Sequence, residues 1–91
     1  MNDGKNKVKV KIYGEEYTIK SELPVNYMKR LAEYVNTKMQ ELSQVTGSIS
    51  KTRIAVLTAI NLSNEIYNLK REVKKLNIKL EEKSKKTGDA K

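Results

Sequence analysis

A long helix with a regular apolar stripe dominates the pattern of hydrophobic and polar positions along this chain. Between Ser50 and Lys83 the sequence contains neither proline nor glycine. Toward its end, apolar residues recur in alternating steps of four and three, which is the 3.5-residue period of a coiled coil. These residues, called the seam below, are Leu62, Ile66, Leu69, Val73, Leu76 and Leu80. The remaining residues are too few to cover a helix that lengthens by about 1.5 Å per residue, so the pattern predicts that the seam meets another chain.

The heptad register indicates how two chains would pair. With Ile66, Val73 and Leu80 at a positions, most a residues are β-branched, and the d positions carry Leu62, Leu69 and Leu76. This combination favours a parallel two-stranded coiled coil. Ile78 falls at an f position, outside the seam. It marks either a further helix–helix contact, which would produce a dimer of dimers, or a single exposed apolar residue.

The first half of the same helix, residues 50–67, carries apolar residues on several faces. Besides the seam there are two more stripes, made by Val56, Ile60 and Tyr67 and by Ile54 and Leu57. A helix that is apolar nearly all round is expected to be buried nearly all round. We therefore expect residues 50–67 to belong to a head domain and residues 68–83 to form a coiled-coil stalk. Asn61 is polar in this stretch, and we expect it to be partly buried and hydrogen-bonded within the head or the dimer interface.

The N-terminal half of the chain predicts a hairpin followed by a helix. Residues 1–7 are polar and expected to be disordered. Residues 8–19 alternate on both sides of a turn at 13–16, which predicts that Val8, Val10 and Ile12 share one face with Tyr17 and Ile19. Helical spacing begins at Pro24 and ends near Leu42, before a run of turn-forming residues. Ser50 is a suitable N-cap for the long helix. The fold class is therefore α+β, with a head at 8–67 that contains the hairpin 8–19, the helix 24–42 and the helix start 50–67.

Charge and composition narrow the possible partners without choosing one. The 91 residues carry a net charge of +8, and the aperiodic segment 84–91 is predicted to be a disordered basic tail. A basic excess attracts nucleic acid, anionic membranes or acidic proteins alike. No apolar run approaches the roughly 18 residues that a membrane span needs, so we expect a cytoplasmic protein without one.

The chain has few side chains of the kinds that enzymes use for catalysis. The chain has no His and no Cys, which excludes Ser–His and Cys–His nucleophiles and the usual zinc sites. The carboxylate pairs at 15–16 and 81–82 are expected to be solvated, and the isolated Gly14 and Gly47 form no phosphate-binding loop. We therefore expect no enzymatic activity, no cofactor and no metal.

Binding to nucleic acid is the main alternative from another class. Lysines of the stalk and tail could neutralise phosphates, and five tyrosines could stack on bases. However, the lysines are interleaved with acids, and the stalk lacks the dense basic block of a DNA-binding zipper helix. We expect no specific nucleic-acid binding, and two alternatives stay open: a basic coiled-coil nucleic-acid-binding protein and a coiled-coil adaptor for another protein.

Three segments in order carry a resemblance to a known family. They are a strand and turn at 10–14, a helix beginning at Pro24, and the run Arg53-Ile54-Ala55-Val56-Leu57-Thr58-Ala59-Ile60-Asn61-Leu62 leading into a coiled coil. Together they resemble the bacterial cell-division proteins of the ZapA family, over about residues 7–83.

The resemblance implies a function and a set of partners. Proteins of this family bind the tubulin-like GTPase FtsZ, bundle its protofilaments and stabilise the cytokinetic Z ring at midcell, without being enzymes. They form homodimers, and two dimers associate into a tetramer. Basic residues of the head have been connected with FtsZ, yet Glu15 and Glu16 stand where a basic residue often follows the strand-turn glycine. Our hypothesis therefore places the FtsZ contact on the remaining head cations, which are Lys29, Arg30, Lys51 and Arg53.

Overall fold

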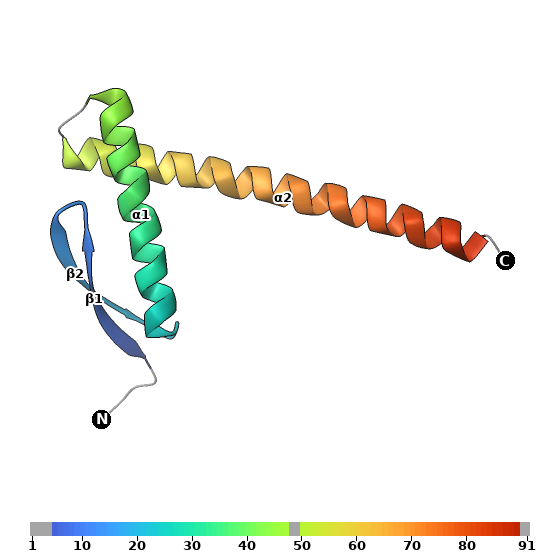
Figure 1. Ribbon diagram of the computed structural model, residues 1–91, viewed down its shortest axis with the longest axis horizontal. Helices are drawn as coiled ribbons and strands as arrows, with labels where there is room; N and C mark the ends of the chain where they lie inside the picture. Colours follow the sequence, from blue (N-terminus) through green and yellow to red (C-terminus); the bar gives the residue numbers. More distant parts are fainter. Residues whose placement is uncertain (1–4, 48–49, 90–91) are drawn as a thin grey trace. The chain divides into compact units, whose positions relative to one another are not determined.

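The computed structural model describes residues 5–47 and 50–89, which form a β-hairpin followed by two helices (Figure 1). The elements are β1 (Asn6–Ile12), β2 (Glu15–Ser21), α1 (Val25–Thr46) and α2 (Lys51–Asp89). The predicted α+β class is confirmed. Of the predicted disordered ends, residues 1–4 and 90–91 lie outside the described residues, while Asn6 and Lys7 already belong to β1.

The hairpin turn is tighter than the sequence pattern predicted. The strands pair antiparallel with Val8 opposite Ile19 and Val10 opposite Tyr17, which confirms the predicted shared face. The turn itself contains only Tyr13 and Gly14, with φ angles of 50° and 84°, whereas Glu15 and Glu16 are part of β2. Positive φ at both central residues is typical of a two-residue hairpin loop, although tyrosine rarely adopts it, so the four-residue turn expected at 13–16 was wrong.

A small apolar core lies between β1 and α1. Val8 and Val10 pack with Met28 and Ala32, and all four side chains are no more than 7% exposed. Period-two alternation places both valines on the face of β1 that meets the helix. A two-stranded sheet is marginal by itself in water, so this helix contact is what stabilises the hairpin.

Local hydrogen bonds set three of the helix ends. The Pro24 carbonyl accepts from the N–H of Met28 at 3.0 Å, so the proline precedes α1 instead of lying within it. α1 ends at Thr46, later than the predicted Leu42, because Gly47 adopts the left-handed conformation and its N–H donates to the Ser43 carbonyl at 2.9 Å. The hydroxyl of Ser50 accepts from the N–H of Arg53 at 3.3 Å, which confirms the predicted N-cap of α2.

α2 continues beyond the end expected from the sequence. Residues 84–89 are helical, where the pattern predicted a disordered tail. Loss of apolar periodicity does not end a helix by itself, since Lys is a good helix former and the first glycine after Ser50 is Gly88.

The chain divides into two compact units, Met1–Thr58 and Ala59–Lys91. The division falls within α2, before the boundary that the pattern placed after Tyr67. Ile54 and Thr58 are buried, but Val56, Ile60 and Tyr67 are each more than half exposed. The expectation that residues 50–67 are buried on nearly all faces is therefore not met within one chain, because the first unit is too small to cover more than one stripe.

We expect Asn36 to hold the strained hairpin turn. Its side-chain oxygen accepts a hydrogen bond of 2.8 Å from the N–H of Tyr13. Asn36→Leu removes the acceptor and should lower the free energy of unfolding by about 1 kcal/mol, whereas Asn36→Asp keeps an oxygen there and should change it less. Urea unfolding at one fixed chain concentration measures both. Equal midpoints for the leucine variant and the parent chain would contradict this role.

Candidate functional site

Lys51, one of the predicted contact residues, is already engaged within the chain. Its Nζ lies 2.5 Å from Oε1 of Glu15 and 5.7 Å from the ring centroid of Tyr17. The Tyr17 hydroxyl donates to Oε2 of the same glutamate at 3.1 Å. The first residue of α2 is thus joined to the first residues of β2, and the Glu15 carboxylate partly neutralises its charge.

The pKa values of this ion pair respond as the geometry requires. The hydrogen bond from Lys51 lowers the pKa of Glu15, and the Tyr17 hydroxyl and the lysine's charge lower it further. The hydrogen bond to Glu15 raises the pKa of Lys51, against a smaller opposing effect of desolvation. The ion pair therefore favours the charged forms of both side chains.

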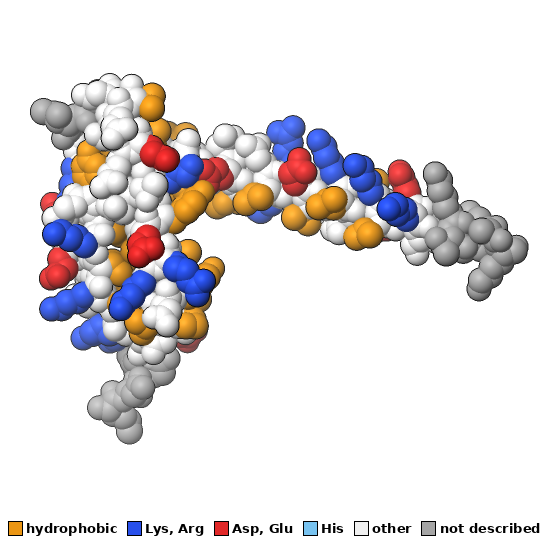
Figure 2. All heavy atoms as spheres, viewed as in Figure 1, with side chains coloured by type: hydrophobic (Ala, Val, Ile, Leu, Met, Phe, Trp, Pro, Cys, Tyr) orange, Lys and Arg blue, Asp and Glu red, His pale blue; other side chains and the backbone are white. Residues whose placement is uncertain are grey.

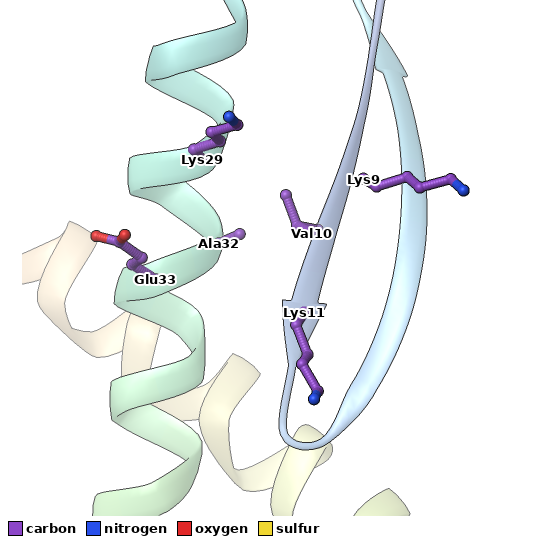
Figure 3. Close-up of a pocket in the computed structure, with 6 residues that line it drawn as sticks. All are labelled: Lys9, Val10, Lys11, Lys29, Ala32 and Glu33. Carbon is purple, nitrogen blue, oxygen red and sulfur yellow. The ribbon is translucent and has the colours of Figure 1, made fainter.

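Lys29 lies in a different environment, beside the hairpin. It lines a shallow hollow together with Lys9, Lys11, Val10 and residues of α1, of which Glu33 is acidic. In Figure 3, Val10 and Ala32 point toward each other across the contact of β1 and α1, while Lys9 points away from the helix. The backbone of β1 thus brings two lysines close to Lys29 that the sequence hypothesis had not included.

The four predicted contact cations do not form one cluster. Arg30 and Arg53 are exposed, Lys29 lies beside β1, and Lys51 is paired with Glu15. The signal that could have indicated Lys9 and Lys11 was the alternation of valine and lysine in residues 8–11, which assigns alternate residues to opposite faces of a strand. The same alternation that buries Val8 and Val10 exposes Lys9 and Lys11.

An apolar groove opens between the hairpin and α1. It is lined by Ile12, Ile19, Ser21, Leu23, Met28, Leu31, Ala32 and Val35. Leu23 is 40% exposed and Leu31 43%. The groove exists because α1 packs on β1 and leaves the apolar residues of β2 only partly covered. Exposed apolar surface of this kind is typical of an association site.

The seam is the second exposed apolar surface. Leu62 is half-buried, and the other five seam residues are between 52% and 64% exposed. Figure 2 shows hydrophobic side chains along one side of the later part of α2 and basic side chains along the other. Ile78, outside the seam, is 47% exposed, and Asn61 is half-buried as expected. The helix thus has the amphipathic surface of a coiled-coil partner, left bare in the single chain.

Neither a metal-ligand cluster nor a membrane-spanning helix occurs in the part of the chain that the structure describes. In the ranges 5–47 and 50–89, no three His, Cys, Asp or Glu side chains are grouped to hold a metal ion. None of the helices within those ranges carries an apolar stretch that could cross a bilayer. What the arrangement offers is surface: an apolar groove, an apolar seam and exposed cations.

Comparison with known proteins gives consistent matches over most of the chain. The family model of cell division protein ZapA matches residues 8–89. A cell division protein ZapA from Bacillus pumilus is 38% identical over 84 residues, which cover 91% of this chain and 99% of the relative. Its counterpart from Halalkalibacterium halodurans is 36% identical over 87 residues, covering 96% of this chain and 90% of the relative.

A solved structure agrees with the fold. A mutant ZapA dimer from Geobacillus stearothermophilus matches with a TM-score of 0.66 and 32% identity, over 88% of this chain and 93% of that one. The hairpin, the two helices and the bare seam define a small α+β protein with a long helix suited to association. The chain belongs to the ZapA family of cell division proteins.

We expect the Lys51–Glu15 pair to contribute to stability in a pH-dependent way. A glutamate with a lowered pKa adds stability above its ordinary pKa, about 4.3, and this is lost as the pH falls through the folded value. Lys51→Met should therefore lower the thermal unfolding midpoint near neutral pH, and the deficit should narrow as the solution is acidified. Arg53→Met, which removes an exposed cation two residues away, should have little effect at either pH. A deficit for Lys51→Met that stays constant on acidification would show that Glu15 is not its partner.

Proposed function

We propose that this chain is a non-enzymatic adaptor that binds FtsZ, crosslinks and bundles its protofilaments and stabilises the Z ring at the midcell division site in the cytoplasm. Membership of the ZapA family is the observation that carries this proposal. The lack of His and Cys is compatible with a binding protein and removes the commonest nucleophiles and general bases.

Self-association is the first part of the proposed mechanism. The seam leaves a row of large apolar side chains in water, and each Leu or Ile that a partner covers contributes up to about 1.5–3 kcal/mol before the entropy of association is subtracted. A parallel homodimer through Leu62, Ile66, Leu69, Val73, Leu76 and Leu80 would bury this row. The related structure from Geobacillus stearothermophilus is described as a dimer, which supports the same assembly here.

A second copy also offers an occupant for the other apolar surfaces. The groove lined by Leu23 and Leu31 and the exposed stripe of Val56 and Ile60 would both lose contact with water in a dimer. Ile78 would then be left for a contact between two dimers. A dimer of dimers would carry four copies of the first unit.

Crosslinking follows from having more than one binding unit in one assembly. Each unit Met1–Thr58 presents exposed cations, including Lys29, Arg30 and Arg53, to an acidic partner. An exposed ion pair is worth less than about 1 kcal/mol, so a single contact would be weak. Several units in one assembly, facing repeated sites along a filament, would convert weak contacts into stable bundling through a high effective concentration.

We expect a charge in the seam to dissociate the dimer. Leu69→Lys places a lysine at a d position of both chains and should weaken dimerisation by about a hundredfold or more, since two buried leucines are lost. Asn68→Lys adds the same charge at the neighbouring, outward c position and should leave the dimer intact. Sedimentation equilibrium measures both. Equal dissociation constants for the two variants would exclude the seam as the interface.

We expect bundling of FtsZ to depend on this assembly. In co-sedimentation with filaments polymerised by GTP, the parent chain and Asn68→Lys should pellet with FtsZ and form bundles visible by electron microscopy. Leu69→Lys should lose most of both, because single units bind without avidity. If the parent chain fails to pellet even at low salt, the proposed function is wrong. Binding to oligonucleotides that falls steeply with salt would then favour the nucleic-acid alternative.

A further inference from the structure

The side of α2 opposite the seam carries a charge pattern centred on Ile78. Two lysines lie three and four residues before it, and two glutamates lie three and four residues after it. Residues at these spacings share one face of a helix, so the five side chains form a single surface, called the charged face below. All are exposed, and Figure 2 shows charged side chains of both signs on the side of α2 away from the apolar row. The charged face consists of Lys74, Lys75, Ile78, Glu81 and Glu82.

The lysines and glutamates of the charged face cannot neutralise each other within one helix. Lys74 precedes Glu81 by seven residues, as Lys75 precedes Glu82, which corresponds to about 10 Å along the helix axis. Ion pairs on a helix form between residues three or four apart. Each chain therefore presents positive charge on one side of Ile78 and negative charge on the other, and this arrangement is complementary to a reversed copy of itself.

A second copy of α2 laid antiparallel across Ile78 matches every member of the charged face. A two-fold axis at Ile78 brings the two isoleucines together and reverses the order of the charges. In a helix that turns about 100° per residue, Lys74 and Glu81 lie on one side of Ile78. Lys75 and Glu82 lie on the other side. Lys74 therefore faces the partner's Glu81. Lys75 faces the partner's Glu82, and the symmetry repeats both ion pairs.

Parallel arrangements of the same surface do not match. A parallel contact in register would put lysines beside lysines and glutamates beside glutamates, and such like-charge contacts disfavour the wrong arrangement. A parallel contact shifted by about seven residues, or two helical turns, would pair opposite charges but separate the two copies of Ile78. Only the antiparallel arrangement satisfies both the charges and the apolar residue.

We propose that two dimers associate through the charged face, with their α2 helices antiparallel across Ile78 and their register fixed by the reciprocal lysine–glutamate pairs. The inference rests on the proposed function, because it names the residues that select the polarity of the dimer of dimers. Thr58, the last residue of the first unit, lies about 20 residues before Ile78, or roughly 30 Å of helix. The antiparallel contact therefore separates the two Thr58 positions by roughly 60 Å along the helices.

The chemistry of this contact gives it a different salt response from the seam. Exposed ion pairs are screened by salt, whereas burial of the leucines in the seam depends little on it. Rising ionic strength therefore separates the dimers from each other before it separates the two chains of a dimer. Crosslinking between filaments is the part of the proposed function that this contact controls.

The first test exchanges charges in the full-length chain. The reversed variant carries Glu81→Lys and Glu82→Lys, which make the charged face wholly basic. The exchanged variant adds Lys74→Glu and Lys75→Glu, which restores the complementary pattern with opposite signs and the parent's composition. A control with Glu22→Lys and Glu41→Lys has the same charge change as the reversed variant, at exposed positions of the first unit. Glu and Lys have similar helix propensities, so α2 should form in all of them.

Sedimentation equilibrium measures the association of dimers. The reversed variant should show a dimer–dimer dissociation constant about tenfold or more above that of the parent chain, because every ion pair becomes a repulsion. The exchanged variant should lie within about threefold of the parent and the control within about twofold. In about 1 M salt, where the Debye length is about 3 Å, the parent should dissociate to dimers and no further.

The second test measures polarity with single cysteines, which the parent chain lacks. Ile78→Cys and Arg71→Cys are treated with a short bismaleimide crosslinker. Both positions lie on the outer sides of a parallel dimer, too far apart for a crosslink within it. The antiparallel contact brings the two copies of position 78 together but holds those of position 71 roughly 20 Å apart. Only Ile78→Cys should therefore crosslink, and the yield should fall in the reversed variant.

Each contrary outcome identifies which claim is wrong. Equal dimer–dimer affinities for the parent and the reversed variant, or an exchanged variant that fails to recover, would overturn the charged face as the contact. A crosslink at position 71 would show a parallel contact, and a parent chain that stays a dimer at every concentration would show none.

Co-sedimentation with FtsZ filaments tests the proposed function separately. The reversed variant should still pellet with filaments but form fewer bundles than the exchanged variant, because its dimers do not associate. Equal bundling by the two would show that this contact does not control crosslinking. If the parent chain ignores filaments, the proposed function fails, whereas the sedimentation and crosslinking results still decide whether dimers associate through the charged face.

Discussion

The main constraint on this structure is the small size of the chain. One chain of this length cannot bury all of its own apolar surface. Its main core cluster is four side chains, Val8, Val10, Met28 and Ala32, beneath a two-stranded sheet that is marginal by itself. The seam residues of α2 stay largely in water, and so do parts of the groove beside α1. In the proposed homodimer, folding and association are coupled, so the stability of the protein should rise with its concentration.

The charged residues have different surroundings in the two places where the structure groups them. At the start of α2, Lys51 forms an ion pair with Glu15 and contacts the ring of Tyr17, so its charge stabilises the first unit. On the outer face of the hairpin, Lys7, Lys9 and Lys11 are exposed along β1, with Glu16 opposite Lys11. The first arrangement contributes to the fold, whereas the second presents positive charge to the solvent.

The proposed function uses two kinds of interaction, apolar contacts for self-association and charged contacts for partner binding. Apolar association through the seam should be little affected by salt, while contacts made by exposed cations of the first unit should weaken as ionic strength rises. In the proposed adaptor, the assembly can persist while its affinity for a filament is adjusted. Because the apolar and basic surfaces use different residues, each can be altered without the other, which makes the mechanism open to separate tests.

The sequence by itself determined the element types, the buried face of β1, the seam and the N-cap at Ser50. Each of these features depends only on residues that are close together in the chain. Tertiary contacts decided the rest. The turn at Tyr13 is held by Asn36, twenty-three residues away, and Glu15 became a strand residue paired with Lys51. The division of α2 after Thr58 likewise depends on how far the first unit reaches along the helix. Local patterns carry no information about such long-range partners, so the cations suggested by the sequence proved to lie in separate environments.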